Sequence, residues 1–198
     1  MRAVKFDISP MGMLFWAAVY YVLEDKMFAA LLLPVLVHEL GHLLMLCMLG
    51  LRVKSVSIEL RGICISYFGY TGAAGHALAA FCGPAAGFIF AWLAAAAGMR
   101  MSSDTLCMSA GISLALSAFN MLPALPLDGG RIMQNLLGVF CSEYKTAAVC
   151  ETVSLISGAG LLLFGLYALF LGKGAGLIIA AIWLLSCQEG VVKRREIM

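Results

Sequence analysis

Charged side chains are scarce in this chain. Only 12% of its 198 residues are Asp, Glu, Lys or Arg, whereas 63% are hydrophobic, and the mean hydropathy is +0.98. A water-soluble domain of this length cannot hide so much apolar surface, because a large part of its surface must face water. The formal net charge of +2 is too small to indicate a nucleic-acid partner, so none is expected. The composition therefore predicts an integral membrane protein.

The chain also lacks paired cysteine motifs and a recognisable cleaved leader. Its seven cysteines form no C-x-x-C pair, are odd in number and lie mostly in apolar stretches. We interpret them as small buried apolar residues rather than disulfides or zinc ligands. The stretch MRAVKFDISPMGM has no basic region followed by an apolar run and a cleavage site. A cleaved signal peptide is therefore not expected, and a first span can serve as an uncleaved signal.

Long apolar segments are what the chain has in quantity. A helix needs about 20 apolar residues to cross a bilayer, and the second, third and fifth segments meet this length, whereas the fourth is near the lower limit and the first and last are short. We predict an all-α membrane protein, a polytopic bundle of about six transmembrane helices. The segments are Met11–Leu23, Phe28–Leu49, Ala77–Ala97, Leu106–Leu122, Thr152–Leu171 and Gly174–Cys187.

The basic residues predict the orientation of these segments. With the N-terminus in the cytoplasm and six crossings, ten of the thirteen Lys and Arg residues fall on the cytoplasmic side. The other three are Lys26, Arg100 and Lys173. This bias follows the positive-inside rule. It predicts a multi-pass protein of the cell membrane with both termini in the cytoplasm.

One stretch has the period of a strand rather than a helix. Residues 56–67 alternate apolar and polar side chains on both sides of Gly62. We predict a short membrane-associated β-hairpin over Val53–Phe68, between the second and third helices. The rest of the chain is too short for an added soluble domain, so residues 1–198 are expected to form one transmembrane domain.

The apolar stretch LLPVLVHELGHLLMLCMLG contains two histidines and a glutamate. At 3.6 residues per turn, His38 and His42 lie about 40° apart around a helix and can offer two imidazole nitrogens to one ion. Glu39 lies about 100° from His38, within reach of a water on that ion. This is the H-E-x-x-H pattern of a zinc site with a carboxylate base. The alternative is a pair of histidines that only hydrogen-bond to neighbouring helices.

A metal explains why these groups are tolerated in a membrane. Neutral imidazoles avoid the full cost of a buried charge, and a bound Zn²⁺ would balance the charge of Glu39. Pro34 removes one backbone hydrogen bond before His38 and is expected to bend the helix. Such a bend would either admit water to the site or serve packing alone.

A catalytic zinc ion usually has three protein ligands. The candidates for the third are His76, in a Gly/Ala-rich segment, and Asp128, in FNMLPALPLDGGRI. Prolines and glycines around Asp128 break the helix, and irregular backbone at membrane depth needs a protein or water lining. We favour Asp128 as the third ligand. The alternative is that Asp128 only caps a helix through Met133–Val139.

Three motifs resemble those of the site-2 protease family of intramembrane zinc metalloproteases: HELGH, AFCGPAAGF and NMLPALPLDGGR. The resemblance implies that His38, His42 and Asp128 bind one Zn²⁺ per chain and that Glu39 is the general base. It also implies that Asn120 and the backbone near Pro126 contact the substrate.

The short chain is most similar to the bacterial sporulation type of this family, although it has no room for a PDZ or CBS domain. That similarity implies a membrane-associated regulatory protein as substrate, such as a sigma-factor precursor or an anti-sigma factor, and is compatible with a membrane-protein regulator. The hairpin would align an extended substrate along its edge; alternatively, it only plugs the bundle. Two rival functions remain: a membrane metal-binding or transport protein without proteolysis, and an inactive scaffold.

Overall fold

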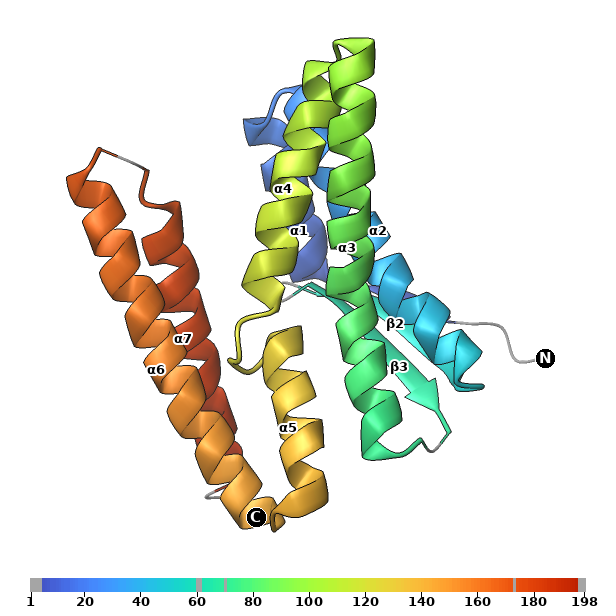
Figure 1. The fold of residues 1–198 in the computed structure, drawn as a ribbon, viewed down its shortest axis with the longest axis vertical. Coiled ribbons are helices and arrows are strands. Elements are labelled where there is room, and N and C mark those ends of the chain that lie inside the picture. Colours follow the sequence, from blue (N-terminus) through green and yellow to red (C-terminus); the bar gives the residue numbers. More distant parts are fainter. Residues whose placement is uncertain (1–4, 60–61, 70, 173, 196–198) are drawn as a thin grey trace. The chain divides into compact units, whose positions relative to one another are not determined.

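The computed structural model describes the backbone of residues 5–59, 62–69, 71–172 and 174–195. The chain divides into two compact units, Met1–Ala118 and Phe119–Met198, and helices dominate both (Figure 1). The predicted all-α class is therefore confirmed. Three helices among the described residues are long and apolar enough to cross a membrane, namely α2 (Asp25–Met48), α3 (Ala73–Met101) and α6 (Glu143–Phe170).

The other predicted segments also fold as helices, but as shorter ones. They are α1 (Pro10–Val22), α4 (Asp104–Asn120) and α7 (Gly176–Arg195). The Ser9 hydroxyl caps α1 by accepting a hydrogen bond of 3.0 Å from the Gly12 N–H. The count of six crossings remains a prediction, because among the described residues only α2, α3 and α6 reach the length and hydropathy of a membrane span.

The first unit contains a small sheet with the strand order β1-β2-β3. Strands β2 (Arg52–Glu59) and β3 (Gly62–Phe68) form the predicted hairpin, and the intervening Leu60 and Arg61 lie outside the described residues. The prediction missed β1 (Lys5–Ile8), which pairs parallel with β2. Two strands that pair in parallel are far apart in sequence and are not joined by a tight turn. The pattern of either strand alone therefore does not predict the pairing.

Close helix packing shapes the rest of the first unit. Helices α2 and α3 pack side by side (Figure 1), and the buried residues of α3 are all Ala, Gly or Pro. Such small side chains allow helix backbones to approach closely in a membrane. Helix α4 adds a polar contact to α3, because the Ser113 hydroxyl donates a hydrogen bond of 2.8 Å to the Gly87 carbonyl.

The second unit contains α5 (Asp128–Phe140), α6 and α7. Helices α6 and α7 pack at glycines: a Cβ at Gly158 would contact the Leu185 side chain. The loop before α5 contributes Ala124 and Leu127 to a buried apolar cluster with Leu184 of α7. That cluster ties the loop to the helices that follow it.

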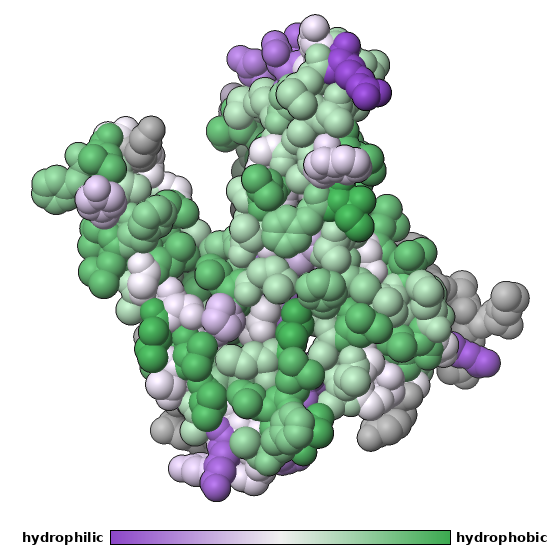
Figure 2. Space-filling view, in the orientation of Figure 1, coloured by the Kyte–Doolittle hydropathy of each residue, from purple (hydrophilic) through white to green (hydrophobic). Residues whose placement is uncertain are grey.

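The helix surfaces are apolar where a membrane would contact them. Large apolar side chains such as Trp92, Phe164 and Phe170 are exposed. Figure 2 shows apolar surface along the long helices, with hydrophilic side chains gathered near helix ends. This distribution is inverted relative to a water-soluble protein and fits a lipid environment.

The cysteine prediction is partly wrong. Cys150 is buried, as expected, whereas Cys47 and Cys107 are exposed. A thiol is only weakly polar, so a position on an apolar helix surface suits it as well as a buried position does.

Candidate metal centre

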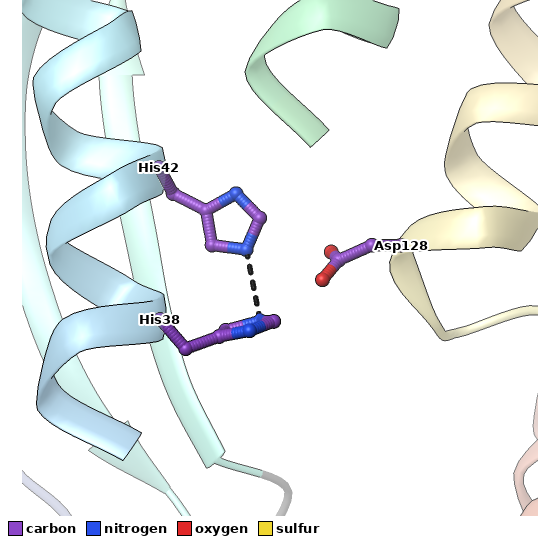
Figure 3. A group of neighbouring side chains, drawn as sticks. All are labelled: His38, His42 and Asp128. Atoms are coloured by element: carbon purple, nitrogen blue, oxygen red, sulfur yellow. Dashed lines mark hydrogen bonds between the residues drawn. The ribbon is translucent and has the colours of Figure 1, made fainter. Parts of the chain in front are cut away.

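The HELGH motif lies within α2, with its two histidines one turn apart. The Nε2 atoms of His38 and His42 are 3.2 Å apart, and the rings meet edge to face with centroids 4.9 Å apart (Figure 3). His38 is buried and His42 is half-buried. The spacing predicted from the sequence therefore brings both Nε2 atoms to one point beside the helix.

This distance fits a shared zinc ion. Zn–N bonds of 2.0–2.1 Å in a tetrahedral site place two ligand nitrogens about 3.3 Å apart. The observed separation of 3.2 Å is close to that value. The separation of the two nitrogens therefore matches that required by one shared ion.

The protein fixes the tautomer of His42 through its other ring nitrogen. Nδ1 lies 2.8 Å from the Ala79 carbonyl oxygen of α3. Because a carbonyl only accepts, Nδ1 carries the proton and donates it, which leaves the lone pair of Nε2 for a metal. Such a hydrogen bond behind a ligand orients the ring and raises its basicity.

Gly83 of α3 makes room for the same ring. A Cβ at this position would overlap the Nε2 and Cε1 atoms of His42. Gly83 is the first residue of GPAAG in the AFCGPAAGF motif, and the sequence pattern alone predicts no contact for it. The contact of the Ala79 carbonyl with His42 was not predicted either, because the identity of a residue does not indicate what its backbone carbonyl binds.

Glu39 follows His38 on α2 and is half-buried. On a regular helix its side chain leaves about 100° around the axis from that of His38. It therefore lies beside the histidine pair rather than opposite it, on a helix that runs unbroken through Pro34.

His76, the alternative third ligand, is engaged elsewhere in the first unit. It lies in the first turns of α3, where its Nδ1 is 3.0 Å from the Tyr67 hydroxyl of β3. This contact links the sheet to α3. The structure therefore gives His76 a structural partner rather than a place beside the histidine pair.

Asp128 is the first residue of α5 and is buried, with 6% of its surface exposed. The N-cap is Leu127, and no side chain caps the helix. The alternative expectation, a cap for a helix through Met133–Val139, is therefore wrong in both residue and boundary. A carboxylate in the first turn is favoured by the helix dipole. Arg131, one turn on, approaches it to 4.0 Å from an exposed position.

The two expected substrate contacts bracket the loop before α5. Asn120 is the last residue of α4 and Pro126 lies two residues before Asp128. Both side chains are half-buried. Gly129 and Gly130 let this loop fold back onto the start of α5, because a Cβ at either one would overlap the backbone of residues 121–125.

Comparisons with known proteins agree with these features. Residues 99–164, about one third of the chain, match peptidase family M50. Two curated relatives carry the name "Putative zinc metalloprotease": Rip3 of Mycobacterium tuberculosis and sll0528 of Synechocystis. Rip3 is 34% identical over 136 residues, covering 61% of this chain and 33% of Rip3. The protein sll0528 is 32% identical over 109 residues, covering 52% of this chain and 29% of sll0528. The chain thus spans about one third of the length of these relatives.

The fold has a solved counterpart. The site-2 protease from Methanocaldococcus jannaschii is similar with a TM-score of 0.70 and 20% sequence identity, and the likeness covers 96% of this chain and 91% of that one. The likeness extends well beyond the segment that matches the family. Residues 99–164 therefore match peptidase family M50, and the fold of the chain is similar to that of a site-2 protease.

Proposed function

We propose that this protein is an intramembrane zinc metalloendopeptidase. The observation that carries the proposal is the 3.2 Å separation of the two Nε2 atoms on a helix apolar enough to cross a membrane. The names of the two curated relatives and the likeness to a site-2 protease support the same activity.

His38, His42 and Asp128 are the three ligands in this proposal, as the resemblance of their motifs to those of site-2 proteases implies, and they would bind one Zn²⁺ per chain. Two neutral imidazoles and one carboxylate are a donor set typical of catalytic zinc, which keeps a fourth position for water. Bound zinc supplies Lewis acidity and a nucleophile that is active at neutral pH.

The other side chains at the site have separate roles in this proposal. The Glu39 carboxylate accepts a proton from the attacking water and delivers it to the leaving amine of the cleaved peptide. His42 stays neutral and oriented, because Ala79 accepts the proton of its Nδ1. Asn120 and the backbone at Pro126 hold the substrate chain.

The substrate in this proposal is a membrane-associated regulatory protein, such as a sigma-factor precursor or an anti-sigma factor. Its cleaved segment is extended, because proteases act on unwound chains. Strands β1 and β3 are the two edges of the sheet, and we assign β3 the pairing with that segment by β-addition. The resemblance of HELGH and NMLPALPLDGGR to the motifs of site-2 proteases supports a substrate of this kind, and we include the sporulation type and a bacterial cell membrane in the proposal.

We keep the predicted topology, with both termini in the cytoplasm, as part of the proposal. In a variant without its native cysteines, Ser102→Cys between α3 and α4 is expected to react with an impermeant maleimide from outside the cell. Ser142→Cys between α5 and α6 is expected to react only after the cell is opened. The reverse pattern would contradict the orientation.

Glu39→Gln tests the activity directly. The full chain is co-expressed with membrane-tethered transcription-factor precursors, cleavage is followed by immunoblot, and zinc is measured in the purified protein. We expect zinc to remain at one per chain and cleavage to fall by at least about a hundredfold, because general-base catalysis contributes 10²–10⁴-fold.

Glu24→Gln is the matched control, since Glu24 is exposed and lies at the start of α2, far from the motif, where its side chain makes no capping hydrogen bond. It is expected to cleave like wild type. Equal cleavage by Glu39→Gln and wild type would contradict the base assignment. Zinc flux through vesicles, with no cleavage of any precursor, would favour a transport protein instead.

A further inference from the structure

One buried hydroxyl of α6 holds the loop that leads to Asp128. The Leu125 N–H donates a hydrogen bond of 2.9 Å to Ser154 Oγ, and the Ser154 hydroxyl donates one of 2.6 Å to the Cys150 carbonyl. Ser154 is 1% exposed and Cys150 is fully buried. The hydroxyl therefore uses both its donor and its acceptor capacity inside the second unit.

This serine differs from others that bond to their own helix. Thr152 on α6 and Ser186 on α7 also donate to the carbonyl four residues back, at 2.9 and 2.8 Å, but both are exposed. Ser154 makes the same intrahelical bond and in addition accepts a donor from a separate segment. Its hydroxyl thus joins two parts of the chain, 29 residues apart.

The bonded loop has little freedom at the anchored point. Ala124 is fully buried and Leu127 is 5% exposed. On the other side, a Cβ at Gly130 would overlap the Ala124 carbonyl and the Leu125 nitrogen. Residues 124–127 are thus fixed between the start of α5 and the body of α6, and Asp128 follows directly.

An apolar environment makes this anchor costly to lose. A backbone N–H without a partner at membrane depth loses the full free energy of its hydrogen bond, because no water replaces it. Leu125 lies three residues before Asp128. If the loop rearranges so that the Leu125 N–H reaches another acceptor, the Asp128 carboxylate therefore moves with it.

We infer that Ser154 is a positioning residue for the third zinc ligand. It acts through the Leu125 N–H and holds the backbone from which Asp128 projects, without touching the ion or the substrate. The inference rests on the proposed function, because it takes Asp128 to be a zinc ligand.

Ser154→Ala removes the acceptor and leaves the helix otherwise intact. Loss of a group that orients a ligand typically weakens metal affinity by about 10–100-fold, and we expect a loss in that range. Ser154→Cys keeps the size and a weaker acceptor, so its affinity should lie between those of wild type and Ser154→Ala. Ser186→Ala, the matched control, should bind zinc within about twofold of wild type.

The measurement uses the full-length protein in detergent. Zinc affinity is obtained by competition with a chromophoric chelator, and the visible spectrum of Co²⁺-loaded protein reports the ligand geometry. The expected result is the order wild type, Ser154→Cys, Ser154→Ala in affinity, with a changed cobalt spectrum in the two Ser154 variants only.

Equal affinities of wild type and Ser154→Ala would overturn the positioning role, as would an equal loss in Ser186→Ala. If Ser154→Ala does not fold, the comparison of Ser154→Cys with wild type decides: reduced affinity supports the role and unchanged affinity overturns it. A wild-type protein that binds no zinc would instead overturn the proposed function, so the two failures are distinguishable.

Discussion

The proposed zinc ligands come from two segments, a histidine half and an aspartate half, which are built in opposite ways. The histidine half lies on one regular helix, where i, i+4 spacing alone brings His38 and His42 together. The aspartate half lies at the end of an irregular loop, where Asp128 depends on contacts with α6 and on the glycines after it. Local geometry therefore secures the first half, whereas non-local packing secures the second.

This difference teaches where the centre is vulnerable. A helix keeps its side-chain spacing even when its neighbours shift, because its hydrogen bonds are internal. A loop keeps its shape only while its outside partners remain. Substitutions far from the ligands should therefore harm the aspartate half more than the histidine half.

The largest effect is expected on removing a ligand from either half. His42→Ala and Asp128→Ala should each lower zinc affinity by on the order of a thousandfold, since three ligands share the binding free energy. Isothermal titration with zinc, on both variants and on wild type, measures this. Similar losses of zinc affinity would support one shared ion. An unchanged affinity in Asp128→Ala would mean that Asp128 does not bind the ion held by the histidines.

Gly83→Ala tests whether the histidine half also depends on a neighbour. The added Cβ would overlap the His42 ring, so the ring would turn and lose its bond to Ala79. We expect zinc affinity to fall by about 10–100-fold, measured by chelator competition. Gly111→Ala on α4 is the control, because nothing lies within 4 Å of its new Cβ. A neutral Gly83→Ala would mean that α2 alone orients the ring.

Gly130→Ala tests the packing of the aspartate half. Its Cβ would meet the backbone of Ala124 and Leu125, and such overpacking costs about 1–3 kcal/mol of unfolding free energy. Gly138→Ala, on the same helix with nothing within 4 Å, should instead stabilise by about 0.5–1 kcal/mol. Unfolding in mixed micelles compares the two. Equal stabilities would show that the loop adapts to α5 at no cost.

The smallest effect is expected between α3 and α4, away from both halves. Ser113→Ala removes the bond to the Gly87 carbonyl, and polar contacts between membrane helices are worth about 0.6 kcal/mol on average. Unfolding free energy should fall by roughly that amount while zinc affinity stays the same. A clear loss of zinc affinity would mean that the packing of α4 on α3 also affects the position of the histidines.

The sequence predicted what depends on local periodicity and missed what depends on distant contacts. The histidine pair and the hairpin follow from spacings of four and two residues, and the structure has both. The start of α5 at Asp128 was missed, because Gly129 and Gly130 read as helix breakers although they serve close packing.

Three features of the centre had no usable signal in one chain. The Ala79 carbonyl, the space at Gly83 and the Ser154 hydroxyl act through partners between 29 and 41 residues away. Alanine, glycine and serine are common in membrane helices for packing reasons alone. Only the folded structure distinguishes the alanine, glycine and serine residues that contact a proposed ligand or its loop from those that serve packing alone.

The parallel pairing of β1 with β2 constrains how the chain threads the bilayer. Residues 5–8 lie beside residues 55–58, so the segment between them begins and ends on the same side of any membrane that it crosses. If α2 crosses, α1 crosses too, although its 13 residues span only about 20 Å. That reach is shorter than a hydrocarbon layer of about 30 Å. Lipids next to α1 would then be compressed, and water would come closest to mid-membrane depth beside this first hairpin of helices.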